Sequence, residues 1–334
     1  MPLPSPQTVA LNVTDPSMVG ETRRIAGNIA AACGFDATVI GKVTIVASEA
    51  AKNLIQHAGG GQILLHQTVE GDLEIIAIDR GRGIADVARC MVDGYSTAGT
   101  AGIGLGAMSR LSDAFDIYTV PGQGTVVICH FDSATPVQAK LFDLGGISVP
   151  KPSESVCGDA WACYQDNQRV LIFVADGLGH GLGAADASRE AVQTFHESIS
   201  QSPADILQAV HGALRKTRGA AASIAEIRMD EAKVSFAGVG NVSGVITRVD
   251  GTTRNMVSHN GTLGHEARKF QHFDYDWMPE DSVILFSDGL NTKWRLSDYN
   301  GLISRAPTLI AGVIYRDHSR GRDDATVVVA KSRG

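Results

Sequence analysis

The stretch Val170-Leu171-Ile172-Phe173-Val174-Ala175-Asp176-Gly177-Leu178-Gly179-His180-Gly181 combines an apolar run with an acidic, glycine-rich turn. The first six residues are mostly β-branched or aromatic, which is typical of a buried strand. The glycines allow a turn that few other residues could adopt. Apolar residues at helical spacing from 184 to 199 predict a helix after the turn. We therefore expect the strand to deliver the Asp176 carboxylate to the edge of a site.

The same arrangement of an aspartate at a strand terminus occurs in three other segments. Gly158-Asp159 precedes a short strand, Asp288 follows the run 283–287, and Asp323-Asp324 begins the strand 327–329. Ordinary turn chemistry explains any one of these segments, because Asp-Gly is a common turn pair. Four in this order instead predict that the carboxylates converge.

Converging carboxylates require a counter-charge. Two unit charges 4 Å apart repel by about 4 kcal/mol at an effective dielectric constant near 20. Ligands that are all oxygen favour Mg²⁺ or Mn²⁺ over zinc or copper. A metal pair about 3.5–4 Å apart can bridge a hydroxide and clamp a phosphate. The four segments are therefore expected to hold two divalent cations that could act on a phosphate.

The first half of the chain contains a different set of motifs. Glu49 and Asn53 lie four residues apart on a helix expected over 37–57, so they share one flank, although such pairs are usually just solvated. Strands are expected near 62–69, 73–78, 115–119 and 125–131. The second of these strands runs into Asp79-Arg80-Gly81-Arg82-Gly83. A glycine cluster over 99–106 precedes a helix that begins near Ala107, and backbone N–H groups at such a helix start suit phosphates. The cluster has neither the Walker ending nor the position of a Rossmann fingerprint.

The overall composition restricts the class of protein. At 334 residues the chain is long enough for two domains, and the polar, aperiodic segment 132–136 divides it into 1–135 and 140–334. A net charge of −7 without a basic run disfavours nucleic acid as a partner. No apolar stretch approaches the roughly 18 residues of a membrane span. The N-terminus does not have the pattern of a secretory signal. Five scattered cysteines favour reduced thiols and a cytoplasmic location.

The order Glu49-x-x-x-Asn53, Asp79-x-Gly81-x-Gly83, Gly102-x-Gly104-x-Gly106 and Gly124-Thr125 resembles the Bergerat-fold ATPases, the group of gyrase, Hsp90, histidine kinases and MutL. Within that group, the segment 93–99 and the short lid resemble the RsbT- and RsbW-type serine kinases of bacterial partner switching. The resemblance covers about residues 8–131 and implies an α/β sandwich that binds ATP.

This resemblance also implies roles for single residues. Asn53 would bind the Mg²⁺ that bridges the ATP phosphates, and Asp79 would accept a hydrogen bond from the adenine amino group. Glu49 would be the general base toward a serine hydroxyl. The remaining nucleotide-binding positions would be Gly81, Gly83, Gly102, Gly104, Gly106 and Thr125.

The second half resembles the metal-dependent (PPM-type) serine/threonine phosphatases of the SpoIIE and RsbX branch over about residues 142–332. The resemblance rests on the four acidic segments together with Gly240-Asn241. It implies an α-β-β-α sandwich in which two Mn²⁺ or Mg²⁺ ions are held. Asp176 would bridge both ions, and the Gly177 carbonyl would bind one of them. The other ligands would be Asp159, Asp288 and Asp323, the first of the pair 323–324.

Two positions depart from the phosphatase pattern. Larger eukaryotic relatives place an arginine ahead of the first acidic motif to hold phosphate, and here only Lys151 is nearby. Cys157-Gly158-Asp159 replaces the more usual Gly-Gly-Asp. A buried hydrophobic role and oxidative sensitivity both stay open for Cys157, and His180 is either a turn residue or a proton-transfer group.

Together these patterns predict an α/β (α+β) protein that acts as a bifunctional partner-switching regulator. A kinase half and a phosphatase half would act on STAS-domain partners, which are anti-sigma-factor antagonists or stressosome components. Opposed activities on one chain would waste ATP, so we expect different targets or mutual control. The sequence is compatible with an oligomer. Two alternatives stay open: a first half that only binds ATP and sequesters a partner, and a pseudoenzyme scaffold.

Overall fold

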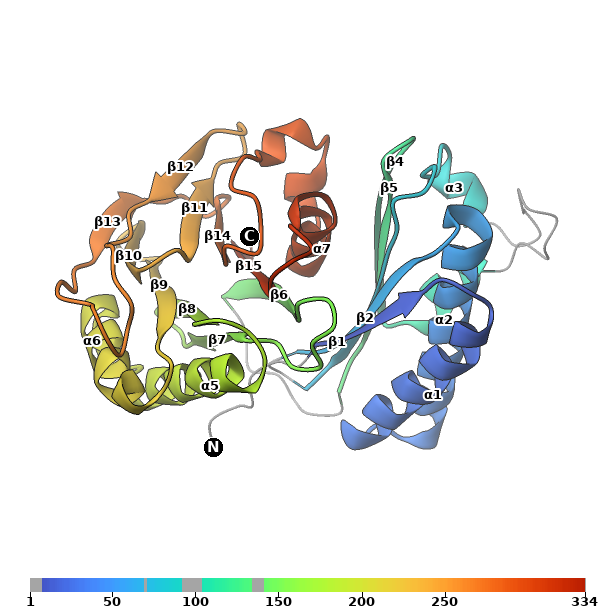
Figure 1. The fold of residues 1–334 in the computed structure, drawn as a ribbon. Coiled ribbons are helices and arrows are strands. Elements are labelled where there is room, and N and C mark those ends of the chain that lie inside the picture. Colours follow the sequence, from blue (N-terminus) through green and yellow to red (C-terminus); the bar gives the residue numbers. More distant parts are fainter. Residues whose placement is uncertain (1–7, 69–70, 92–103, 134–140, 334) are drawn as a thin grey trace. The chain divides into compact units, whose positions relative to one another are not determined.

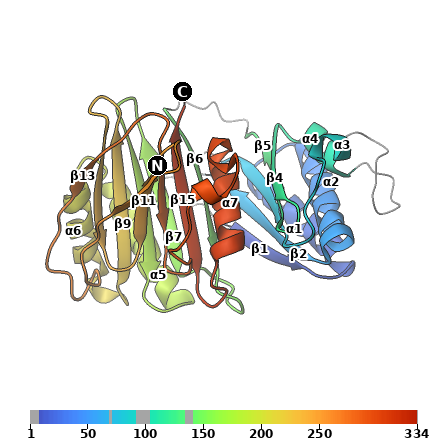
Figure 2. The ribbon, with the colours of Figure 1, turned by 90° about the horizontal axis from the view of Figure 1, so that it is seen from above.

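A computed structural model describes residues 8–68, 71–91, 104–133 and 141–333. The chain divides into two compact units, of which the described residues are 8–133 and 141–333. Figures 1 and 2 show these units from two directions. No helix among the described residues is both long and apolar enough to cross a membrane.

The first unit is a two-layer sandwich of helices on one antiparallel sheet (Figure 1). The sheet order is β1-β2-β3-β5-β4. The strands are β1 (Thr8–Val13), β2 (Gly61–Gln67), β3 (Leu73–Ile78), β4 (Ala114–Val120) and β5 (Gly124–Phe131). The helices are α1 (Ser17–Ala32), α2 (Ala37–Asn53), the short α3 (Val87–Cys90) and α4 (Gly104–Leu111). One apolar core lies between the two layers, because α1 and α2 direct their buried residues at the strands.

Two helix boundaries in this unit differ from the sequence-based expectation. The helix expected over 37–57 leaves the α conformation after Asn53 and continues as one π-turn, Leu54–Ala58. Gly59 ends it in the left-handed conformation (φ 73°), as a glycine after a helix commonly does. The helix expected from Ala107 already begins at Gly104. The unpaired N–H groups of its first turn therefore come from the glycine cluster itself.

The second unit consists of two five-stranded antiparallel sheets with helices on the outside. The first sheet has the order β13-β10-β9-β8-β7 and the second has β12-β11-β14-β15-β6. The first sheet is built from β7 (Asp159–Gln165), β8 (Arg169–Gly177), β9 (Ala220–Arg228), β10 (Lys233–Val239) and β13 (Phe273–Asp276). The second sheet is built from β6 (Phe142–Val149), β11 (Ser243–Thr247), β12 (Thr253–Met256), β14 (Ser282–Phe286) and β15 (Ala325–Ser332).

Helices cover the outer face of each sheet. Helices α5 (Leu182–Glu197) and α6 (Pro203–Ala213) pack on the first sheet, and α7 (Pro307–His318) packs on β6 and β15 of the second. Three 3₁₀ turns complete the unit, Leu214–Lys216, Leu296–Asp298 and Leu302–Ser304. Phe173 of β8 stacks on Phe195 of α5, with ring centroids 5.1 Å apart. The result is the expected α-β-β-α sandwich, and the α+β fold class is confirmed.

Helix α7 is a long element that the sequence patterns did not indicate. Eight consecutive residues of this helix, Pro307–Ile314, are buried, and so is Arg316. A helix that is covered on all sides lacks the one-sided apolar stripe from which an amphipathic helix is predicted. Its place against β6 and β15 is therefore visible only in the folded unit.

Candidate functional site

In the first unit a cavity of about 530 Å³ lies at the end of α2, beside β3, α4 and β5. A volume of this size is within the range of small-ligand sites. Five of the residues expected to contact nucleotide line it, namely Asn53, Asp79, Gly83, Gly104 and Thr125. Glu49, Gly81 and Gly106 do not line it, and Gly102 lies outside the described residues.

Two backbone hydrogen bonds hold Asp79 opposite Thr125. The Asp79 N–H donates to the Thr125 carbonyl (2.9 Å), and the Thr125 N–H donates to the Asp79 carbonyl (3.2 Å). The Asp79 carboxylate also accepts from the Gly81 N–H at 2.7 Å. Gly124 (φ 87°) is required here, because a Cβ at this position would lie 2.1 Å from the Asp79 carbonyl oxygen. Gly81 therefore orients Asp79 although it does not line the cavity.

Asn53 lies at the junction between α2 and the π-turn. A Cβ on Gly104 would lie 2.9 Å from Asn53 Oδ1, so the glycine cluster approaches the Asn53 amide closely. The π-turn places His57 in the cavity wall, where burial lowers the pKa of its imidazole and Arg82 lowers it further. Glu49, one turn before Asn53, pairs with Lys52 at 2.7 Å. The sequence patterns gave no role to His57, although its spacing of four from Asn53 was visible.

In the second unit the expected metal ligands come from both sheets. Asp159, the first residue of β7, lies directly opposite Asp176 near the end of β8. Asp288 follows β14, and Asp323 precedes β15 in the other sheet. The four side chains interact electrostatically, because Asp159, Asp288 and Asp323 all raise the pKa of Asp176.

Close backbone contacts join the segments of the second sheet. The Ser287 N–H donates to the Thr326 carbonyl (3.0 Å), and the Thr326 N–H donates to Ser287 Oγ (2.9 Å). A Cβ on Gly289 would lie 1.8 Å from the Asp324 carbonyl oxygen, so only glycine fits there. Only glycine fits at position 177 of the first sheet as well, since a Cβ there would lie 2.1 Å from the Ala184 carbonyl oxygen. The Asp-Gly pairs therefore permit close packing around the carboxylates.

Burial and mutual repulsion both act on the carboxylates. Burial raises the pKa of Asp176, and the neighbouring carboxylates raise it further. Burial likewise raises the pKa of Asp159, although the Ser287 and Thr326 hydroxyls act in the opposite direction. Within the described residues, no lysine, arginine or histidine forms an ion pair with any of the four. The described part of the chain therefore concentrates negative charge here without supplying a cation.

Two carboxylate oxygens at this place are buried and have no hydrogen-bond partner, Asp159 Oδ2 and Asp324 Oδ2. Asp324 accepts the Lys151 N–H on its other oxygen at 2.8 Å. Buried oxygens of this kind are costly unless they are compensated. A pair of hard divalent cations fits this donor set, because aspartate oxygens are the ligands that such cations prefer.

Two residues join the site that the sequence patterns did not assign to it. The pattern favoured the first aspartate of the pair 323–324, yet Asp324 is the more buried, at 4% exposure. Asn241 donates its Nδ2 to Asp288 Oδ2 at 2.6 Å. Gly240-Asn241 was recognisable as a motif, but its partner lies 47 positions away. His180 Nδ1 lies 2.7 Å from Glu154 Oε1, so the histidine fixes the turn to the loop before β7.

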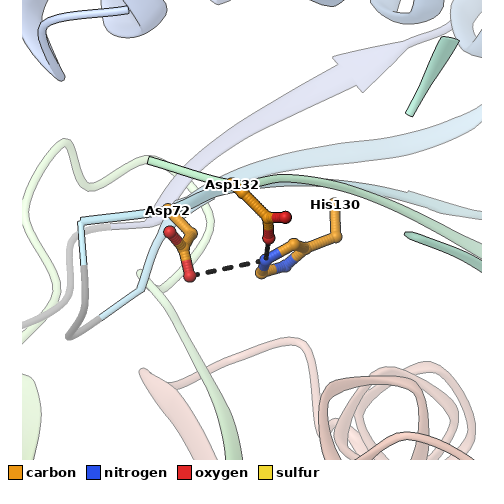
Figure 3. Close-up of side chains that lie close together, drawn as sticks. All are labelled: Asp72, His130 and Asp132. Atoms are coloured by element: carbon orange, nitrogen blue, oxygen red, sulfur yellow. Dashed lines mark ion pairs between the residues drawn. The ribbon is translucent and has the colours of Figure 1, made fainter. Parts of the chain in front are cut away.

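A different cluster of titratable groups lies at the end of β5 in the first unit (Figure 3). His130 Nε2 lies 3.4 Å from Asp72 and 3.2 Å from Asp132, and its Nδ1 lies 3.3 Å from Glu74. Burial alone would lower the pKa of His130, but the carboxylates of Asp72 and Glu74 raise it to about 10. Burial would raise the pKa of Asp72, yet hydrogen bonds from His130 and Ser133 lower it to about 2. A protonated imidazole cannot bind a metal ion, so these groups form an ion cluster.

Comparisons with known proteins agree with both resemblances. The model of the histidine kinase-like ATPase domain matches residues 13–130, and that of stage II sporulation protein E (SpoIIE) matches residues 166–333. The serine/threonine-protein kinase RsbT of Bacillus subtilis is 39% identical over 108 residues, which are 31% of this chain and 81% of RsbT. The phosphoserine phosphatase RsbX of B. subtilis is 27% identical over 141 residues, 42% of this chain and 71% of RsbX.

A solved structure supports the fold of the second unit. The crystal structure of RsbX in complex with magnesium aligns with 59% of this chain and 98% of its own, with a TM-score of 0.51 and 21% identity. Both expected resemblances are thereby confirmed. The chain belongs to the stage II sporulation protein E (SpoIIE) family through residues 166–333, and it carries a histidine kinase-like ATPase domain over residues 13–130.

Proposed function

We propose that the second unit hydrolyses phosphoserine or phosphothreonine on a protein, using a pair of Mg²⁺ or Mn²⁺ ions. The observation that carries this proposal is the convergence of one buried and three partly buried aspartates, with which no lysine, arginine or histidine of the described residues forms an ion pair. The relative RsbX is named a phosphoserine phosphatase, and its solved structure contains magnesium. Both facts agree with the donor set of this site.

In this proposal each residue has a stated role. Asp159, Asp176, Asp288, Asp323 and the Gly177 carbonyl would hold the two ions, with Asp176 as the ligand that they share. When bound, the ions would lower the pKa of a water molecule and neutralise the phosphate. Asn241 holds Asp288 in place through its 2.6 Å hydrogen bond. The Ser287 and Thr326 hydroxyls act on Asp159 from the second sheet.

The test is hydrolysis of p-nitrophenyl phosphate with Mn²⁺ or Mg²⁺ by the parent and by Asp176→Asn. We expect the parent to be active and the variant to lose at least about 10³-fold in kcat, as loss of a bridging ligand requires. The matched control is Asp250→Asn, an exposed aspartate of the same unit, which keeps full activity. Equal rates for parent and Asp176→Asn would refute the assignment, and an inactive parent would favour the pseudoenzyme scaffold.

For the first unit we propose binding of ATP with Mg²⁺ and transfer of the γ-phosphoryl group to a serine of a STAS-domain partner. Asp79 would accept from the adenine amino group, and Asn53 would bind the Mg²⁺. The cavity that they line supports this assignment, as does the similarity to RsbT, which is named a serine/threonine-protein kinase. The N-terminal end of α4 faces the same cavity, where its N–H groups suit phosphates.

Glu49 would be the general base that takes the serine proton while the serine oxygen bonds to the γ-phosphorus and ADP leaves. Glu49 contacts Lys52, and the Glu49 side chain is 26% exposed while that of Lys52 is 48% exposed. Pairs of this kind contribute little free energy, so substrate binding can displace Lys52. The competing possibility is that the unit binds ATP and a partner without transferring phosphate.

Labelled ATP and a STAS-domain protein separate these two functions. We expect the parent to label the partner and Glu49→Gln to lose at least about 10²-fold in rate, as expected for a general base. Equilibrium dialysis with ATP should show unchanged affinity for Glu49→Gln, because Glu49 does not line the cavity. Absence of transfer by the parent, with ATP still bound, would favour the sequestering module. Asp79→Asn should reduce ATP binding itself.

A further inference from the structure

Beyond the metal ligands, the turn after Asp176 carries two exposed leucines. Leu178 is 53% exposed and Leu182 is 68% exposed. Single exposed apolar side chains are ordinary. These two lie four residues apart, Leu178 in the turn and Leu182 at the first position of α5, and Leu178 is two residues from Asp176. They therefore flank the glycine turn that directly follows the Asp176 carboxylate.

A cation lies against the same turn. A Cβ on Gly179 would lie 3.3 Å from Arg218 Nη1, and one on Gly183 would lie 2.6 Å from Arg218 Nε. Gly179 is the neighbour of Leu178 and Gly183 is the neighbour of Leu182, so the guanidinium lies along the stretch that the leucines bracket. Larger residues at these glycines would displace it. Within the described part of the chain the guanidinium forms no ion pair with a carboxylate.

The turn is held on both sides. The Leu178 N–H donates to the Gly219 carbonyl at 2.9 Å, which continues the pairing of β8 with β9 up to Gly219, the residue after Arg218. On the other side His180 contacts Glu154 at 2.7 Å, and a Cβ on Gly181 would lie 3.1 Å from the Glu154 carboxylate. A fixed turn loses little conformational freedom when a ligand binds to it.

We propose that Leu178, Leu182 and Arg218 form a substrate-docking rim that receives a phosphorylated protein segment with apolar residues beside the phosphoserine or phosphothreonine. This inference rests on the proposed phosphatase function of the same unit. Arg218 donates N–H groups to the phosphate or to the backbone next to it, as a guanidinium does with oxyanions. The leucines bury the apolar neighbours of the phosphorylated side chain. Continuity with the carboxylates and the unpaired charge of Arg218 favour this ligand over an uncharged one.

The full-length protein with Mn²⁺ can test the leucines with two synthetic phosphoserine decapeptides. One carries leucine on both sides of the phosphoserine and the other carries glycine. We expect the parent to prefer the leucine peptide about tenfold in kcat/KM, and Leu178→Ala/Leu182→Ala to abolish this preference. The matched control is Val249→Ala, a 56% exposed apolar residue elsewhere in the unit, which keeps the preference. Equal kcat/KM for both peptides in the parent would overturn the role of the leucines.

Arg218 is tested by inhibition with inorganic phosphate. We expect Arg218→Ala to weaken this inhibition about tenfold and Arg218→Lys to recover part of it, because lysine keeps the charge without the planar fork. Arg215→Ala is the matched control, an exposed arginine three residues earlier. Unchanged inhibition in Arg218→Ala would overturn the role of Arg218.

The controls also separate this inference from the function on which it rests. If the parent does not hydrolyse p-nitrophenyl phosphate, the phosphatase assignment itself fails. If it does, and the leucine variant differs only in its state of self-association, the rim is a contact between copies of this chain and the docking proposal is wrong.

Discussion

The molecule contains two clusters of carboxylates that differ in how their negative charge is compensated. In the first unit Asp72, Glu74 and Asp132 surround His130, which becomes a cation within the fold. The pKa of Asp72 is consequently lowered to about 2. In the second unit burial and the neighbouring aspartates raise the pKa of Asp176, and no cation of the described residues forms an ion pair with them. A cluster that supplies its own cation is stable as folded, whereas one without a cation would gain stability from the metal ions that we propose.

If the distances between possible ligand atoms were the only criterion, the cluster around His130 would be the better candidate for a metal site. Among the described residues, Asp72, His130 and Asp132 are the one group of three whose possible ligand atoms all lie within 4.8 Å of one another. The aspartates of the second unit are not gathered as tightly. Protonation decides between them, because a histidine with a pKa of about 10 carries its proton at neutral pH and competes with any metal ion. The charge balance of a cluster is therefore a better indicator of a metal site than its compactness.

Removing the internal cation should give the largest effect. We expect His130→Ala to destabilise the first unit by about 3 kcal/mol, because it leaves Asp72 and Glu74 buried without a cation. Each unit has one buried cysteine whose labelling by iodoacetamide in urea reports its unfolding, Cys129 in the first and Cys163 in the second. Cys129 should become reactive at lower urea and Cys163 should not. Asp132 is a 71% exposed partner of His130, so Asp132→Asn should lower the free energy of unfolding by less than about 0.5 kcal/mol.

Adding the missing cation should have a comparable effect on the other unit. With Mn²⁺ or Mg²⁺ at about 100 times its dissociation constant, the second unit should gain about 2.7 kcal/mol. All three tryptophans, Trp161, Trp277 and Trp294, belong to this unit, so their fluorescence follows its unfolding. The protection of Cys129 should not change with the metal ion when nucleotide is absent. If Mn²⁺ or Mg²⁺ stabilised the first unit and not the second, the proposed place of the metal site would be wrong.

The two clusters also differ in how far local sequence patterns predict them. Each of the four proposed ligands of the second unit stands at the start or the end of an apolar run, and that run alone predicts a strand terminus near the aspartate. Asp72 and His130 are 58 positions apart, and a histidine within a strand has no local pattern that indicates an ion cluster. The same holds for Arg218, whose place on the glycine turn depends on the pairing of β8 with β9. Local periodicity predicts elements and their ends, whereas contacts between distant segments follow only from the fold.

Raising the pH should weaken the first unit through His130. The pKa of His130 is about 10 in the folded state and about 6.5 as a free side chain. Its contribution is therefore complete below pH 6.5 and is lost as the pH rises toward 10. A tenfold change in proton affinity corresponds to about 1.4 kcal/mol, and partial exposure reduces the effect, so we expect a loss of about 2 kcal/mol between pH 7 and pH 9.5. The urea concentration at which Cys129 becomes reactive measures this loss, and comparison with His130→Gln at the same pH removes the pH dependence of thiol reactivity itself. His130→Gln should abolish the pH dependence.

Neutralising one carboxylate of the second unit should have the smallest effect and the opposite sign. Because the pKa of Asp176 is raised in the folded state, its ionisation opposes folding as the pH rises above 3.8. Asp176→Asn should therefore stabilise the metal-free protein by about 1 kcal/mol at pH 8, where less repulsion remains. Tryptophan fluorescence in urea with a chelator measures this gain, and Asp250→Asn should show none. If Asp176→Asn is both inactive and more stable, the Asp176 carboxylate serves metal binding and destabilises the metal-free fold. If the variant is less stable, the Asp176 carboxylate is stabilised by protein contacts, as that of Asp72 is.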